Sequence, residues 1–477
     1  MLELNPFRKN KVNLQDYDYQ KDIQNRLLMA RLDAQDLIIL EELLYGHAKL
    51  CASQLAQDLL LDEAQVTQTL NKLADSGLFQ IKEHAIFVNK EVRKYFEAQL
   101  QKFEDNFVPG MEYLQTLLRK VPFHILLTWY PIPRTSNNIF DSLVEKYLLT
   151  PQTFQRYLLE LNFGNETIAS IVDDIYHAPN FSLPAEALKK KYNLSDEEFE
   201  EIALHLEFNF VGCLTYEQVG DRRLQVLSPF HEWKEYLCFL RDSKPQPLTT
   251  PKQMTRYRKQ DFAFIEDMTL LLSLLKTTPL ALTLNTQEEW IPDKTSLKKL
   301  SQLIVGFEDT GTAFLDYLKH LIKKLVFLKL CKIDASLLKL HEDSREWLSF
   351  SLENRALSMY KHTLLRLEQD HLLGEIGTER NVREIEKNLH QVLHLGWVCF
   401  EDFLKGLSAS LNKESKVTLK KQGKHWKYTL PSYTDEECSF IRRVIFEWLF
   451  EAGLVSIGHY KDKEYFCITP FGQSIFS

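Results

Sequence analysis

Apolar side chains recur along the chain at the spacing of an amphipathic helix. In three segments, a residue able to cap a helix is followed by apolar residues four, eight and eleven positions later. The caps and their apolar sets are Asp62 with Val66, Leu70 and Leu73, Thr150 with Phe154, Leu158 and Leu161, and Ser195 with Phe199, Ala203 and Leu206. This spacing places one apolar stripe along a capped helix. We therefore expect a capped, half-buried helix after each of these residues.

A shorter helix is predicted upstream of each cap, for example at residues 52–59 and 185–192. A turn of about three residues joins the two helices, which is the helix-turn-helix arrangement. A short β-hairpin should follow, because Gly77 can end a helix in the left-handed conformation and residues 78–88 alternate into two strands. Similar hairpins are predicted within residues 208–233, 324–348 and 450–476. The predicted fold class is mainly α with small β-hairpin wings.

This order of helices and hairpin resembles the winged-helix family of transcription regulators. More narrowly, EAGLVSIG (451–458) and YFCITPFGQSIF (465–476) resemble the closing element of the helicase-associated winged-helix domain. That domain is found beside DNA helicases of the XPB type and in bacterial proteins that lack a motor. The resemblance implies a multi-domain array of winged-helix and helix-turn-helix units, for which DNA binding is the commonest use. It assigns no function to a single residue, because winged helices share a shape and not a site.

The length of 477 residues predicts several domains, because one hydrophobic core rarely serves so long a chain. Proline-rich and polar stretches at residues 129–138 and 243–251 mark the clearest boundaries. The predicted segments are an N-terminal extension (1–30), a first winged helix (31–100), a connecting helical segment (101–138), a helix-turn-helix plus second winged helix (139–242), a linker (243–260), a degenerate third winged helix (261–372) and a C-terminal winged-helix domain with a basic hairpin (373–477).

Secreted and membrane proteins are not indicated. No apolar stretch matches a signal peptide or a membrane span, which needs about 20 apolar residues. The seven cysteines stand singly, without a CxxC pair or the even framework of a small secreted domain. We therefore expect a cytoplasmic protein with reduced thiols and no membrane partner.

Motifs of catalysis and cofactor binding are absent from the sequence. It has no phosphate-binding glycine loop, no nucleophile elbow and no HExxH zinc motif. His390 and His394 lie one helical turn apart, but Gln391 stands where a zinc protease has its glutamate. We expect a non-enzymatic protein without cofactor or metal, in which these histidines are structural or solvated.

Candidate nucleic-acid-binding residues are found in the first and the last winged helix. A DNA-reading helix needs an outward side with few acidic residues, and there glutamine pairs with adenine while lysine contacts phosphate. The candidates of the first winged helix are Gln65, Gln68, Thr69, Lys72 and Lys82. The candidates of the last one are Arg442 and Arg443 on its helix and Lys461 and Lys463 on its hairpin.

The strongest basic feature is a predicted hairpin between residues 412 and 430, with its turn at Gln422 and Gly423. It gathers Lys413, Lys416, Lys420, Lys421, Lys424, Lys427 and Trp426. Such a hairpin can hold phosphates with its lysines and stack a base on its tryptophan. The alternative is a solvated, lysine-rich hairpin whose tryptophan packs on its own domain. The sequence favours neither interpretation.

Charge elsewhere argues against nucleic-acid binding. The helix that follows Ser195 opens with Asp196, Glu197 and Glu198, which would repel a phosphate backbone, so a protein partner is the expected contact of this acidic helix. The whole chain has 58 basic and 66 acidic residues and a formal charge of −8. Dedicated nucleic-acid-binding proteins tend to be basic instead.

Two functions from different classes follow from these observations. The first is a DNA-associated protein that binds nucleic acid with tandem winged helices, as an accessory or regulatory factor of transcription or helicase machinery. The alternative is a protein–protein assembly scaffold whose winged helices do not bind DNA. The first requires the basic segments to share one continuous face, and we favour it because DNA binding is the commonest use of the fold.

Overall fold

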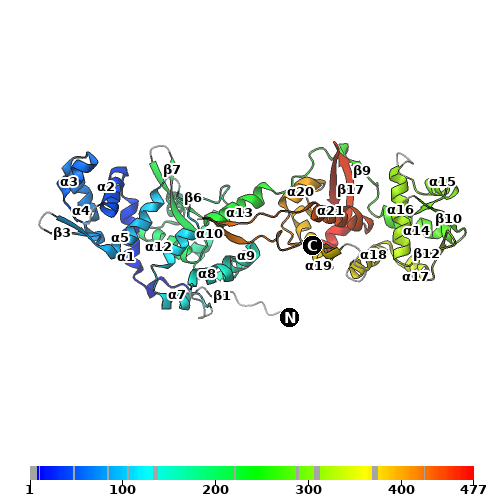
Figure 1. The fold of residues 1–477 in the computed structure, drawn as a ribbon, viewed down its shortest axis with the longest axis horizontal. Helices are drawn as coiled ribbons and strands as arrows, with labels where there is room; N and C mark the ends of the chain where they lie inside the picture. The colour runs from blue at the N-terminus through cyan, green and yellow to red at the C-terminus, as the bar shows by residue number, and fades with distance from the viewer. Residues whose placement is uncertain are drawn as a thin grey trace. The chain divides into compact units, whose positions relative to one another are not determined.

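The structure is a computed structural model that describes residues 8–9, 11–46, 49–82, 85–104, 107–132, 138–219, 222–285, 289–305, 312–367, 374–423 and 425–477. Helices dominate, and the sheets are small and mostly antiparallel (Figure 1). The predicted class, mainly α with small β-hairpins, is confirmed at this level. The chain divides into two compact units, Met1–Cys238 with Thr418–Thr429, and Phe239–Val417 with Leu430–Ser477.

One order of elements occurs four times in the described chain, and each occurrence is called a repeat below. A repeat has a first helix, a short strand, a second and a third helix, and a β-hairpin. A short turn joins the second and third helices in the first two repeats, whereas in the fourth a hairpin within residues 419–428 lies between them. The first repeat comprises α2 (Ala34–Tyr45), β2 (Lys49–Leu50), α3 (Ala52–Leu59), α4 (Glu63–Leu73), β3 (Phe79–Lys82) and β4 (Ala85–Val88). The second comprises α10 (Glu166–His177), β6 (Leu183–Pro184), α11 (Ala185–Tyr192), α12 (Asp196–Phe208), β7 (Cys213–Val219) and β8 (Arg222–Ser228).

The other two repeats lie in the second unit. The third comprises α14 (Ala263–Leu275), β10 (Leu280–Leu284), an added strand β11 (Trp290–Pro292), α15 (Lys294–Leu303), α16 (Thr312–Phe327), β12 (Cys331–Asp334) and β13 (Leu337–Leu340). The fourth comprises α19 (Glu379–Leu389), β14 (Val398–Cys399), α20 (Phe400–Gly406), α21 (Asp435–Arg443), β17 (Val455–Tyr460) and β18 (Lys463–Ile468). In all four, the short strand pairs with the second hairpin strand, so the three strands have the same order.

The remaining elements connect or extend the repeats. In the first unit they are β1 (Arg8–Lys9), α1 (Tyr19–Ala30), α5 (Lys90–Leu100), α6 (Met111–Leu118), α7 (Phe123–Trp129), α8 (Ile139–Leu143), α9 (Pro151–Glu160), β5 (Leu161–Asn162), β15 (Leu419–Gln422) and β16 (His425–Tyr428), with α13 (His231–Asp242) at the boundary. In the second unit they are β9 (Thr255–Arg256), α17 (Ser344–Ser349), α18 (Leu352–Leu367), a π-helical segment (Val444–Leu449) that prolongs α21, and α22 (Pro470–Phe476).

The helix starts follow the capping residues seen in the sequence. Asp62 and Ser195 form capping boxes at the starts of α4 and α12, and Thr150 caps α9. Gly77 lies after α4 with a φ of 72°, in the left-handed region where glycine pays no steric penalty. The local prediction of these helices and of the hairpin after the first of them is confirmed.

Three predicted segments differ from the observed organisation. The N-terminal extension (1–30) contains α1, which packs on α12 and is part of the first unit. The linker (243–260) contains β9, whose residue Arg256 pairs with Gly458 of β17. A side chain at Gly458 would lie 2.6 Å from the Thr255 carbonyl oxygen, so only glycine allows this pairing. The basic hairpin, predicted within the C-terminal domain (373–477), belongs to the first unit.

The turns between second and third helix give a direct stability prediction. Leu60 ends α3 in the left-handed region with a φ of 53°, and its side chain is 93% exposed. Asn193 holds the equivalent position in the second repeat, with a φ of 52°. Asparagine tolerates this conformation, whereas for other residues with a side chain it costs roughly 1–2 kcal/mol of conformational free energy. We expect Leu60→Asn to raise the free energy of unfolding by about 1 kcal/mol in urea titrations.

The reverse exchange is the matched control. Asn193→Leu should lower the free energy of unfolding by a similar amount, because it introduces the strain that Leu60→Asn removes. If Leu60→Asn leaves stability unchanged or lowers it, the strain assigned to this turn is wrong.

Candidate nucleic-acid interface

The outward face of α4 carries uncharged amide side chains. The helix turns Val66, Leu70 and Leu73 into the core of the first repeat, where all three are buried. Gln68 and Asn71 lie on the opposite side and are exposed. They are one helical turn apart and so project side by side. This face therefore presents two neighbouring amide side chains to the solvent.

Gln65 is exposed as well, and it has a second role at the start of the helix. Its side-chain carbonyl oxygen accepts the backbone N–H of Asp62 at 3.4 Å, as one half of the capping box. Asn71 was not among the predicted residues. Its signal in the sequence is its position three residues after Gln68, on the same helical face.

Thr69 does not belong to this outward face, which corrects its assignment as a DNA-contacting residue, whereas Lys72 is exposed but already paired with a carboxylate. Thr69 is 3% exposed, and its hydroxyl donates to Asp36 Oδ1 at 2.6 Å. Lys72 Nζ donates to Asp36 Oδ2 at 2.6 Å. Burial by itself raises the pKa of Asp36, but the hydrogen bonds from Lys72 and Thr69 outweigh it and lower that pKa. Both residues therefore hold α4 against α2.

The basic residue nearest to the tip of the first hairpin is Lys82. It ends β3, is exposed, and has no ion pair with any residue in the described part of the chain. A flexible ammonium in this position suits a phosphate contact, because winged helices use the hairpin to hold the backbone while the helix meets the bases. Lys82 stays a candidate together with Gln65 and Gln68.

The hairpin formed by β15 and β16 is anchored in the first unit by one of its faces. Leu419 and Tyr428 are cross-strand partners and both are buried. The Tyr428 hydroxyl donates to the Leu148 carbonyl oxygen at 2.7 Å, and the Leu419 amide donates to that of Leu149 at 2.8 Å. The inner face of the hairpin is therefore a structural element of the first unit.

Trp426 follows the same inner face. It is half-buried, and its ring meets the ring of Phe140 edge-on with 5.9 Å between centroids. Of the two interpretations left open by the sequence, these contacts favour a tryptophan that packs on its own domain. They correct its assignment as a platform for a base.

The lysines of this region do not form one cluster. Lys420 and Lys427 face each other across the two strands, with Lys427 Nζ 3.7 Å from Glu235, and Lys421 is exposed. Lys413 and Lys416 belong to the second unit. Lys424 lies outside the described residues. Of the predicted six lysines, the structure describes Lys420, Lys421 and Lys427 on the first unit and Lys413 and Lys416 on the second.

The hairpin and α4 do not share a surface. Both belong to the first unit, and Figure 1 shows α4 at one end of that unit and the orange-brown hairpin beside α13 at the other end. The described residues of this unit therefore do not join α4 and the hairpin into the single basic face that binding through all the predicted segments requires (Figure 1).

Three of the four candidates in the fourth repeat already have carboxylate partners. Arg442 Nε donates to Glu464 Oε2 at 2.8 Å, Arg443 Nε lies 3.8 Å from Glu447, and Lys463 Nζ lies 2.7 Å from Glu401. Lys461 instead lies over the ring of Tyr460, 5.2 Å from its centroid. Exposed ion pairs of this kind are weak, but each places a carboxylate beside the cation that a phosphate would need. Arg442, Arg443 and Lys463 are therefore poor candidates for phosphate contacts, and Lys461 stays a candidate.

The acidic helix α12 contacts α1 of its own chain. Arg26 Nε donates to Glu200 Oε2 at 2.7 Å, and Arg26 Nη1 donates to Glu207 Oε2 at 2.8 Å. All three side chains are buried. Burial alone raises the pKa of Glu207, but the charges of Arg26 and Lys102 outweigh it and lower that pKa to about 2. This pairing uses Glu200 and Glu207 within the chain, whereas Asp196, Glu197 and Glu198 at the start of the helix are exposed, so a protein contact there stays a prediction.

The third helices of the repeats therefore differ in what covers them. Helix α12 is covered by α1. Helix α16 and the π-helical segment after α21 share one hydrophobic core, and Lys324 of α16 lies 2.6 Å from Glu451 at the end of that segment. The exposed residues at the start of α12 are acidic and those of α16 include charged side chains, whereas α4 exposes the amide side chains of Gln68 and Asn71.

Three other features of the described residues concern metal binding, membrane spans and disulfides. Within the described ranges, no group of three or more His, Cys, Asp or Glu side chains is arranged to hold a metal ion. No described helix combines the length and apolarity needed to cross a bilayer. The seven cysteines are all free. Comparison of the chain with protein-family models, with curated proteins and with solved structures finds no match.

Proposed function

We propose that this chain is a non-enzymatic, DNA-associated protein in which the first of four winged helices contacts the duplex. The proposal starts from the repeat itself. A helix-turn-helix followed by a hairpin, with a short strand added to the second hairpin strand, is the winged-helix arrangement. Its third helix is the element that enters the major groove in this family.

The observation that carries the proposal is the open face of α4. The third helices of the other repeats hold the chain together, whereas α4 leaves Gln68 and Asn71 exposed beside each other. Glutamine and asparagine amides can pair with the N6 and N7 edge of adenine in a bidentate manner. Lys82 then supplies a phosphate contact from the hairpin.

The charge of this surface sets the kind of binding that is expected. Few cations flank α4, so few counterions are released on binding and the salt dependence should be shallow. Affinity must come mainly from base contacts, which makes the interaction specific in character but modest in strength. An accessory role beside transcription or helicase machinery suits such a module.

A salt series with a labelled duplex library tests this proposal. Gln68→Ala and Asn71→Ala should each weaken binding of the selected duplex by about 1–3 kcal/mol, roughly 5- to 150-fold. Lys82→Ala should weaken binding to all duplexes alike. It should also reduce the slope of log affinity against log salt concentration by about 1. Fluorescence anisotropy with the full chain gives each quantity.

Gln302→Ala is the matched control, because Gln302 is an exposed glutamine on α15 of the second unit. It should leave DNA affinity unchanged. The proposal fails if no duplex binds at about 50 mM salt, where phosphate contacts are strong. It also fails if the α4 variants bind as tightly as the wild-type chain.

The assembly scaffold is the second candidate, and a separate observation favours it. The third helices α12, α16 and α21 are all occupied by intramolecular packing, which is a structural use of the repeat. In this case α4 docks a protein instead of DNA. Gln68→Glu together with Asn71→Glu should then abolish co-purification of a specific partner, and the wild-type chain should bind no duplex.

A further inference from the structure

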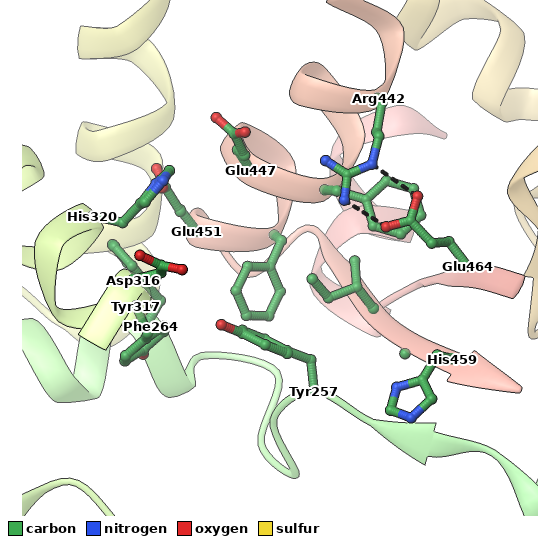
Figure 2. Close-up of a pocket in the computed structure, with 14 residues that line it drawn as sticks. Tyr257, Phe264, Asp316, Tyr317, His320, Arg442, Glu447, Glu451, His459 and Glu464 are labelled. Carbon is green, nitrogen blue, oxygen red and sulfur yellow. Dashed lines mark hydrogen bonds and ion pairs between the residues drawn. The ribbon is translucent and has the colours of Figure 1, made fainter. Parts of the chain in front are cut away.

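A cavity of about 300 Å³ lies within the second unit, between the third helices of the third and fourth repeats. Its walls come from α16, from α21 with the π-helical segment, from β17, and from Tyr257, which follows β9. Figure 2 shows Asp316 and His320 on one side of the cavity, the Arg442–Glu464 pair on the other, and Tyr257 between them. The volume is at the lower end of ligand pockets, so it suits one side chain or a small amine.

Aromatic rings form the apolar part of this cavity. The rings of Tyr257 and Phe450 meet edge-on with 5.7 Å between centroids, and Phe446 lies under the guanidinium of Arg442 at 5.4 Å. Burial raises the pKa of the Tyr257 hydroxyl, which keeps this group neutral. The faces of such rings carry partial negative charge and attract cations.

The charges that line the cavity are mostly negative. The arginine in the wall, Arg442, is held by both carboxylate oxygens of Glu464, with Nε donating at 2.8 Å. Glu451 is buried, and its Oε2 forms an ion pair with Lys324 Nζ at 2.6 Å but accepts no hydrogen bond from the described residues. Two of the four carboxylates in the wall therefore have a close cation within the protein.

For the other two carboxylates, Asp316 and Glu447, the ion pairs found among the described residues are with cations of their own helices, and the charge of Glu447 also acts on His320. Lys319 Nζ lies 3.1 Å from Asp316, and Arg443 Nε lies 3.8 Å from Glu447. Exposed pairs at this spacing are worth little, so both carboxylates can take a second cation at small cost. They border a cavity whose remaining wall is aromatic.

We propose that this cavity binds an organic cation, either a guanidinium or an alkylammonium group. Asp316 and Glu447 supply the opposite charge, and Tyr257, Phe446 and Phe450 supply the aromatic wall. A carboxylate pair next to aromatic rings discriminates against phosphates and other anions, which it repels. The cation comes either from the arginine or lysine of a partner chain or from a free polyamine. This site is separate from α4 and does not depend on the proposed function.

Calorimetric titration of the full chain tests the proposal with three probes: an arginine-containing peptide with blocked ends, spermidine, and a blocked glutamate peptide. We expect saturable binding of at least one cationic probe and none of the glutamate peptide. Asp316→Asn together with Glu447→Gln should lower the affinity for the cationic probe at least tenfold. Glu401→Gln together with Asp402→Asn is the control, because it removes the same charge from an exposed site on α20 and should change nothing.

The relative affinities of the three probes identify the source of the cation or overturn the proposal. Preference for the peptide over spermidine identifies a partner chain as the source of the cation, and the opposite preference identifies a polyamine. If no cationic probe binds, or if the double variant binds as tightly as the wild-type chain, the proposal is overturned. Circular dichroism shows whether the variants are folded. Tyr257→Ala provides a second test, because it keeps every charge but removes part of the aromatic wall, and it should also weaken binding of the cationic probe.

Discussion

Replacing Arg26 by methionine is expected to lower the free energy of unfolding of the first unit by about 3–5 kcal/mol. Arg26 is the shared partner of two buried carboxylates, Glu200 and Glu207. Methionine keeps much of the volume of the side-chain stem but leaves both glutamates without this cation. An uncompensated buried charge is among the costliest single changes in a folded protein.

The pH dependence of this effect has a definite sign. The pKa of Glu207 is about 2 in the folded chain and has a reference value of 4.5. A carboxyl with a lowered folded pKa stabilises the protein above its unfolded pKa, and this stabilisation is lost as the pH falls through the folded pKa. The difference in stability between wild-type chain and Arg26→Met should therefore be largest above about pH 5 and should shrink towards pH 2.

Hydrogen exchange of peptides from α1 and α12, followed through a urea series, measures this effect locally. Arg93→Met is the matched control, because Arg93 forms an ion pair with Glu97 that is about one-third exposed. Such a pair contributes less than about 1 kcal/mol. An Arg26→Met chain within 1 kcal/mol of the wild type would show that the buried pairs contribute little to folding.

Local features of this chain were predictable because they depend on neighbouring residues. The cap at Asp62 and the left-handed Gly77 mark the ends of a short segment, and both are found as expected. The assignment of Thr69 to the DNA-facing side was wrong, although the sequence contained the signal that Thr69 is buried. Thr69 is three residues after Val66 and four before Leu73, so helical geometry places it on the buried side.

Long-range pairings were not predictable from these patterns. Arg26 and Glu207 are 181 residues apart, and no local spacing identifies them as partners. A run of acidic residues normally indicates a solvated helix face, but here Glu200, a member of the run, is buried, as is Glu207 further along the same helix. The one available signal was the seven-residue spacing of Glu200 and Glu207, which places both on one face of α12.

Tyr428→Ala is expected to lower the free energy of unfolding of the first unit by about 3–5 kcal/mol, the range for loss of a large buried aromatic side chain. Tyr428 is 4% exposed and contacts the rings of Trp233 and Tyr236. Its hydroxyl also donates to the Leu148 carbonyl oxygen, 280 residues away in the sequence. Hydrogen exchange in α6 and α13 should therefore accelerate, because these helices belong to the same unit as the hairpin.

Two further variants separate the structural role of this hairpin from a role in binding. Tyr428→Phe keeps the ring and removes the hydroxyl, so its cost should be only about 0.5–1.5 kcal/mol. Lys420→Ala changes an exposed side chain and should stay within about 0.5 kcal/mol of the wild type. If Tyr428→Ala proves nearly neutral, the hairpin is not part of the fold of the first unit. Its lysines would then be free to be tested as a separate nucleic-acid surface. If instead Tyr428→Ala loses much stability and Lys420→Ala binds DNA as the wild-type chain does, the hairpin serves the fold and not DNA binding.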